Sequence, residues 1–213
     1  MALSKVNFNS MNVTPSASKA IKFNSNNNGL EAADVGGNLI LLSTQTASSS
    51  STISFTSNID STYKEYIFKF YDLNPGTDAS YFQFQADTGT NTSYNQTMTT
   101  TWFNSYHNEA DSGTNLGYST GDDQAQGTSF QSITGLIGNG ADESGAGILH
   151  IFDPSNSTFT KHYMSRMQYL DRNDASIEIY SAGYFNTTTA LTRFQFKFHQ
   201  GNFDGVIKLY GVL

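Results

Sequence analysis

The sequence contains no cysteine and only three prolines in 213 residues. Without cysteine neither a disulfide nor a thiolate metal site can form, so packing, alone or together with partner subunits, must stabilise the fold. The absence of cysteine does not show whether the protein works in an oxidising or a reducing compartment, because a protein of either compartment can lack cysteine. At this length a single domain with an appendage can bury a substantial core without covalent cross-links.

Charge and long apolar runs are also scarce. Charged residues make up 14% of the chain and the formal net charge is −7, which argues against a nucleic-acid partner because phosphate binding needs a basic surface. The first residues lack the apolar run of about 7 to 15 residues typical of a signal peptide. No stretch approaches the ~20 apolar residues of a membrane span. We therefore expect a soluble protein made in a cytoplasm, with no membrane partner.

Aromatic residues are abundant, at 14% of the chain, and Ser, Thr, Asn and Gly supply most of the polarity. This mixture favours strands over helices, because aromatic and β-branched side chains fit a pleated surface while Ser, Asn and Gly weaken helical turns. The composition predicts an all-β protein.

The last twenty residues carry the strongest strand pattern. Phe194, Phe196 and Phe198 alternate with polar residues, a glycine-containing turn follows, and Ile207 and Leu209 alternate again. This pattern predicts a β-hairpin. A terminal strand this apolar must be buried in a sheet, so we expect the C-terminus to complete the core.

Short apolar segments separated by Gly, Asn, Asp and Pro turns continue through residues 39–213. They predict a two-sheet antiparallel β-sandwich or barrel, with a jelly roll of two four-stranded sheets as the leading version. Residues 63–73 are apolar on both faces and predict a central strand. The other expected strands are 39–46, 52–56, 81–87, 94–106, 116–119, 129–137, 148–152, 159–169, 176–184, 191–199 and 206–212.

Residues 1–38 differ in pattern and predict an N-terminal arm, with one short strand between the turn at 25–29 and the glycines at 36–37. The arm holds three lysines against two acidic residues, whereas the rest of the chain holds eight basic and sixteen acidic residues. A weakly basic arm on an acidic body suggests attachment to an acidic surface. The predicted partner-binding residues of the arm are Val6, Phe8, Met11, Val13, Lys19, Ile21, Lys22 and Phe23.

Few side chains suggest chemistry. His107, Glu109 and Asp111 form a candidate metal or acid–base group, and the pairs Asp122–Asp123 and Asp142–Glu143 are candidates for Ca²⁺. None matches a dedicated motif, so solvated loop residues are the favoured interpretation. His150 is expected to be a hydrogen-bonded core or interface residue. We expect no enzyme activity and no cofactor.

Tyrosine is the one residue type that suggests a binding surface. Tyr63, Tyr118, Tyr169 and Tyr180 fall at strand ends or on the less apolar faces of predicted strands. Such rings can stack on sugars or pack at a subunit interface. An ordinary sandwich rim is an equal alternative.

Several segments resemble a family of small virion proteins of tailed bacteriophages, particularly those of marine bacteria and cyanobacteria. The similar stretches are LLSTQTASSSSTISFTSNIDSTYKEYIFKFYDLNP, YHNEADS, DDQAQGTSFQ, GNGADESGAGILHIFDPSN and GYFNTTTALTRFQFKFHQGNFDGVIKLYGV, and SKAIKFNSNNNGLEAADVGG is similar to connecting segments of tail and fibre proteins.

The resemblance implies a jelly-roll-type β-sandwich that forms part of the phage particle. The resemblance does not settle which part. The polar arm and its charge contrast with the body favour a capsid cement or decoration protein whose arm binds the major capsid protein, and we expect a homo-oligomer, with a trimer preferred. The alternative is a tail or fibre module that binds host surface glycan. Either role would place the protein in the virion.

Overall fold

The computed structural model describes residues 19–26, 28–34, 38–89 and 91–213. The chain divides into two units, Met1–Asn38 and Leu39–Leu213. Every regular element in the described residues is a β-strand, and all neighbouring strands pair antiparallel. The predicted all-β class is confirmed. None of the described segments forms a helix long and apolar enough to cross a membrane.

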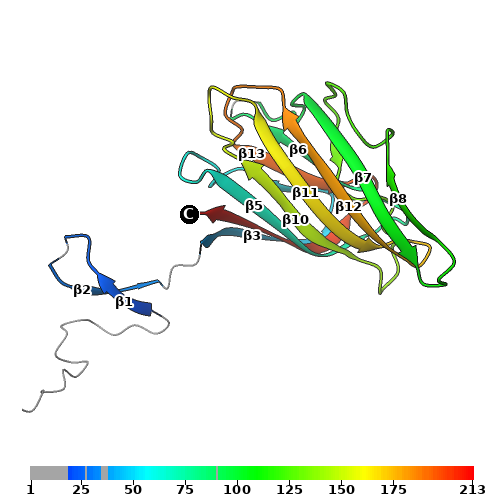
Figure 1. Ribbon diagram of the computed structural model, residues 1–213, viewed down its shortest axis with the longest axis horizontal. Helices are drawn as coiled ribbons and strands as arrows, with labels where there is room; N and C mark the ends of the chain where they lie inside the picture. Colours follow the sequence, from blue (N-terminus) through cyan, green and yellow to red (C-terminus); the bar gives the residue numbers. More distant parts are fainter. Residues whose placement is uncertain (1–18, 27, 35–37, 90) are drawn as a thin grey trace, which may run out of the picture. The chain divides into compact units, whose positions relative to one another are not determined.

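The larger unit is an antiparallel β-sandwich of two unequal sheets, whose main strands Figure 1 shows side by side. The larger sheet has the order β3 (Leu39–Ser50), β14 (Phe203–Val212), β5 (Glu65–Pro75), β10 (Gly145–Phe152), β11 (Lys161–Leu170), β12 (Ala175–Phe185), β7 (Met98–Asn108) and β8 (Thr114–Tyr118). The smaller sheet has the order β4 (Ile53–Phe55), β13 (Arg193–Phe198), β6 (Phe82–Asp87) and β9 (Gln131–Ser132). The predicted jelly-roll-like sandwich is confirmed, but the sheets hold eight and four strands rather than four each.

The core lies between the two sheets and is rich in aromatic rings. Strict alternation in β11 turns Tyr163, Met167 and Tyr169 inward, while the residues between them face solvent. Phe196 from the smaller sheet contacts five other phenylalanine rings, with centroid distances from 4.9 to 6.4 Å. Offset and edge-to-face ring pairs of this kind add to the stabilisation that comes from burial itself.

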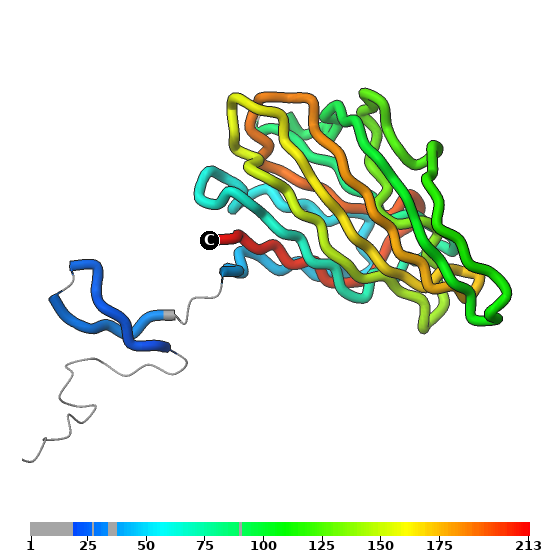
Figure 2. Tube along the Cα trace, in the orientation of Figure 1, coloured from blue at the N-terminus to red at the C-terminus, as the bar shows by residue number. Residues whose placement is uncertain are grey.

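The predicted C-terminal hairpin is wrong. β13 and β14 are consecutive strands, but β13 pairs with β4 and β6 while β14 pairs with β3 and β5. The turn between them therefore crosses from one sheet to the other, and Phe198 and Phe203 meet in the core at 5.5 Å. The expectation that the C-terminus completes the core holds, because Ile207 and Leu209 are fully buried. Figure 2 traces this last strand, in red, beside residues 39–50 in blue.

Two further strand predictions had different outcomes. The doubly apolar segment at 63–73 is central, as predicted, because β5 lies between β14 and β10. The strand expected over 129–137 is reduced to Gln131–Ser132, followed by isolated bridges from Ile137 to Ser80 and Asp171.

The smaller unit contains a two-stranded hairpin, β1 (Lys19–Phe23) paired with β2 (Leu30–Asp34). The sequence predicted a single short strand here. The Asn-rich turn joins the strands through a hydrogen bond from the Asn24 amide to the Gly29 carbonyl. Directly opposite residues share a face, so Ile21 and Phe23 lie on one face with Ala32 and Leu30.

Candidate functional site

Exposed apolar side chains gather on one surface of the larger unit, the face of the eight-stranded sheet that points away from the core. We call this surface the outer face. Seven of the nine large hydrophobic side chains exposed in the larger unit belong to it: Leu39, Leu41, Tyr71, Phe103, Leu116, Tyr118 and Met164. They extend from Leu39 and Leu41 on the edge strand β3 to Leu116 and Tyr118 on the opposite edge strand β8, so they form separate apolar spots on one face rather than a single patch.

Most acidic residues of the larger unit lie away from the outer face. Of its sixteen Asp and Glu residues, four lie on this face: Glu65, Glu178 and Asp204 at outward-facing ladder positions, and Asp72, which is exposed on β5 beside Tyr71. Lys69, Lys208 and Arg166 lie on the same face. The outer face is therefore close to neutral, whereas the rest of the body carries the acidic surplus.

A row of stacked side chains crosses three strands at one side of the outer face. The rings of Phe103 and Tyr180 are nearly parallel, 6° apart, with 4.9 Å between centroids. The guanidinium of Arg166 lies 5.3 Å from the centroid of Tyr180 and forms an ion pair with Glu178. The ion pair with Glu178 thus holds the Arg166 guanidinium close to the aromatic ring.

A second group, which we call the lysine–tyrosine cluster, consists of Lys69, Tyr71, Lys208 and Tyr210 on β5 and β14. Lys69 and Lys208 are directly opposite each other in the ladder. The ammonium of Lys69 lies 5.3 Å from the centroid of Tyr210, and that of Lys208 lies 5.4 Å from the centroid of Tyr71. Burial, together with the adjacent Tyr71, raises the pKa of Tyr210. Its hydroxyl is protonated at neutral pH, as that of an ordinary tyrosine also is.

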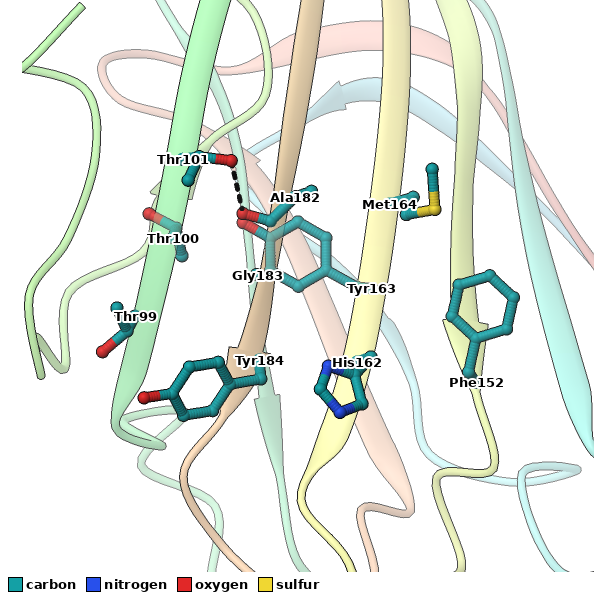
Figure 3. Close-up of a pocket in the computed structure, with 10 residues that line it drawn as sticks. All are labelled: Thr99, Thr100, Thr101, Phe152, His162, Tyr163, Met164, Ala182, Gly183 and Tyr184. Carbon is teal, nitrogen blue, oxygen red and sulfur yellow. Dashed lines mark hydrogen bonds between the residues drawn. The ribbon is translucent and has the colours of Figure 1, made fainter.

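The outer face is hollowed at three places. Figure 3 shows the first hollow, of about 410 Å³, where side chains of β7, β10, β11 and β12 meet. Its rim combines the rings of Phe152, His162 and Tyr184 with the hydroxyls of Thr99 and Thr101. Two more shallow hollows, of about 440 and 340 Å³, lie along the same strands beside Glu178.

His150 lies on the outer face rather than in the core. Its Nδ1 is hydrogen-bonded to the Glu65 carboxylate, and its ring stacks on Phe152 with 6.2 Å between centroids. His150 was expected to be a hydrogen-bonded core or interface residue, and the hydrogen bond agrees with this expectation. The side chain of His150 is half-buried, so it lies at a surface and not in the core.

The acidic loop residues mostly make local contacts. His107 and Asp111 form an ion pair of 3.0 Å on an exposed turn, while Glu109 is exposed and uses its backbone amide to bond to Asp174. Asp123 accepts a 2.5 Å hydrogen bond from the Tyr118 hydroxyl, and this bond raises the pKa of Tyr118.

The remaining acidic candidates do not converge on a common point. Asp122 accepts from the Ser119 hydroxyl at 2.6 Å, and Glu143 accepts from the Gly140 amide. Among the residues that the structure describes, no three or more His, Asp or Glu side chains are grouped to hold a metal ion.

The four tyrosines singled out in the sequence separate into two pairs. Tyr118 and Tyr180 lie on the outer face, as expected for ligand-stacking or interface residues. Tyr169 is buried in the core, and Tyr63 packs against Tyr66. The sequence did not single out Lys69, Lys208 or Arg166, because each appears as an ordinary polar residue in a strand. The pairing of β5 with β14, which are far apart in the sequence, brings Lys69 and Lys208 beside aromatic rings, and the pairing of the consecutive strands β11 and β12 does so for Arg166.

The arm residues are described only from Lys19 onward, and Val6, Phe8, Met11 and Val13 lie outside the described residues. On the hairpin, Phe23 is 71% exposed and Ile21 is 40% exposed, on the same face. Lys22 points to the opposite face and forms an ion pair of 3.4 Å with Glu31. The structure thus brings Ile21 and Phe23 together and separates Lys22 from them.

Comparison with known proteins adds no relative: no family model, no curated protein and no solved structure matches this chain.

Proposed function

We propose that this chain is a non-enzymatic structural protein of a tailed-phage virion, a cement or decoration protein that binds the major capsid protein through its N-terminal unit and stabilises the head. The resemblance of residues 41–212 to small virion proteins supports this role. The N-terminal hairpin supplies the structural argument.

The observation that carries the proposal is the exposed apolar face of the β1–β2 hairpin. An isolated two-stranded hairpin is marginally stable in water, because it has no second layer to cover its apolar side chains. Here Phe23 is mostly exposed and Ile21 is partly exposed on such a face. A partner surface that covers them would stabilise the hairpin and anchor the protein at the same time.

The test compares two faces of the same hairpin. The double variant Ile21→Asn, Phe23→Asn should no longer co-sediment with phage capsids that lack this protein, because it removes the apolar contact. Lys22→Gln, on the opposite face, is the matched control and should bind like the wild type. Deletion of residues 1–38 should abolish binding and leave a folded sandwich. Undiminished capsid binding by the deletion variant would overturn the proposal.

The same resemblance supports a homo-oligomer, and we propose a trimer. Light scattering coupled to size exclusion should give three times the 23.3 kDa mass of one chain. A monomer at all accessible concentrations would contradict this assignment.

A second candidate function, a tail or fibre module that binds host surface glycan, is favoured by the aromatic outer face. Half-exposed rings beside short hydroxyl side chains suit sugar binding, because the rings offer apolar contact and the hydroxyls offer hydrogen bonds. Antibody labelling of intact particles separates the two locations, since label on the head supports the first and label on the tail supports the second.

A further inference from the structure

We propose that the lysine–tyrosine cluster binds the carboxylate or sulfate group of an acidic polysaccharide that extends across the outer face. This site goes beyond the proposed attachment to the capsid and does not depend on it. It also gives the second candidate function a definite class of ligand.

The first argument is the unpaired charge of the two lysines. Like charges directly opposite each other in a sheet are destabilising, and Lys69 and Lys208 occupy such a pair. Arg166 and His150 on the same face each contact a glutamate, but neither lysine forms an ion pair with any acidic residue in the described part of the chain. An incoming anion would relieve the repulsion and complete the cluster.

The second argument is the arrangement of the donors. The two lysines and two tyrosines are related by the local two-fold symmetry of an antiparallel pair, because each tyrosine follows its lysine by two residues. Each ammonium lies over the ring on the other strand. The two tyrosine hydroxyls are hydrogen-bonded to each other, so one hydroxyl proton and the two ammonium groups can donate to the oxygens of one acidic group.

The third argument concerns the size of the ligand. The cluster lies on β14 and β5, and Tyr180 lies on β12, three strands beyond β5. At the usual strand spacing this is about 14 Å, so a ligand that touches both must be extended. Ile148 of β10 and Arg166 of β11 occupy the row between them, and the hollow of about 440 Å³ lies there. An apolar side chain beside polar groups suits a linked sugar ring.

Charge favours an acidic polysaccharide over a nucleic acid. Twelve of the sixteen acidic residues of the larger unit lie outside the outer face, and Asp72 and Asp204 lie on it on the same two strands as the cluster. These carboxylates would repel a densely charged phosphate backbone. Two unpaired lysines suit a ligand with widely spaced acidic groups.

The experiment measures binding of the full-length protein to immobilised polygalacturonate, dextran sulfate and unmodified dextran. We expect binding to at least one acidic polymer, weakened by added NaCl, and no binding to dextran. Tighter binding to polygalacturonate would identify the ligand group as a carboxylate, and tighter binding to dextran sulfate would identify it as a sulfate. The double variant Lys69→Gln, Lys208→Gln should bind about tenfold more weakly, because it loses charge-assisted hydrogen bonds.

Lys197→Gln is the matched control for the lysine substitutions. Lys197 also lies over an aromatic ring, 4.2 Å from the centroid of Phe130, but it belongs to β13 in the smaller sheet. This variant should bind the polymers like the wild type. Tyr180→Ala tests the extended part of the site and should weaken binding severalfold. Unchanged thermal unfolding of each variant verifies that the fold is retained.

Three outcomes would overturn the proposal. The first is that wild-type protein binds neither acidic polymer. The second is that Lys197→Gln and the cluster variant lose equal amounts of polymer affinity. The third is that the cluster variant dissociates an oligomer, because this result would assign the cluster to a contact with acidic residues of a second copy. The cluster variant should still co-sediment with capsids, so failure of this proposal is distinguishable from failure of the capsid-binding role.

Discussion

Phe196 of β13 and Phe68 of β5 meet edge to face across the interface between the two sheets, with 4.9 Å between their ring centroids. Both side chains are fully buried, and they connect strands that belong to different sheets. The contact is therefore one of those that hold the sandwich together.

Phe196→Ala should lower the free energy of unfolding by about 3–5 kcal/mol, because it leaves a cavity at the centre of the aromatic core. Urea denaturation at neutral pH measures the change. Phe159→Ala is the control: this ring is 68% exposed in a loop, and its removal should change stability by no more than about 0.5 kcal/mol. Equal effects of the two substitutions would contradict the core assignment.

Gly147→Ala should destabilise the protein by about 1–3 kcal/mol, because an added methyl group would overpack this site. A Cβ at this position would lie 2.4 Å from Sδ of Met167 and 2.5 Å from the Arg166 carbonyl oxygen. Gly121→Ala provides the comparison, since a Cβ there meets nothing within 4 Å. Thermal unfolding should show a clear loss for the first variant and almost none for the second.

Asp153 should contribute to the stability of the protein toward acid. Hydrogen bonds from Asn156 and from the Lys64 ammonium, at 2.9 and 3.0 Å, lower the pKa of its carboxyl group. A lowered pKa in the folded state gives stability above the ordinary value near pH 4, which is lost as pH falls through the folded pKa. The stability difference between wild type and Asp153→Asn should therefore shrink between about pH 6 and about pH 2. A constant difference in urea titrations over that range would contradict this expectation.

Tyr163 should make stability fall at alkaline pH. Burial raises the pKa of its hydroxyl, which is hydrogen-bonded to Ser181 at 3.1 Å. The unfolded chain releases this proton near pH 10 while the folded protein retains it, so its contribution is complete below pH 10 and declines above it, by up to about 1.4 kcal/mol per pH unit. Tyr163→Phe should reduce the slope of stability against pH above about pH 10. An unchanged slope would argue against the buried position.

Side-chain alternation in the sequence predicted some features of the outer face but not others. Alternation in the segment around Phe68 and Phe70 predicted a central strand, and β5 is central. The pattern of β5 could not show whether its second face, which carries Ile67 and Tyr71, is covered by another layer or open to solvent. Apolar side chains at these two positions are compatible with both arrangements. Tyr118 and Tyr180 were found from the sequence as surface rings, whereas the lysine–tyrosine cluster was not, since its members lie about 140 residues apart in the chain.

The sequence by itself determined that this protein is built from strands and which side of most strands faces the core, because side-chain alternation is a local property of the chain. Phe194, Phe196 and Phe198 are inward-facing for that reason. Only the tertiary structure decided that β13 and β14 enter different sheets, that the sheets hold eight and four strands, and that Lys69 faces Lys208. These features depend on which distant strands pair, and a turn between two apolar segments has the same composition whether it closes a hairpin or crosses the core.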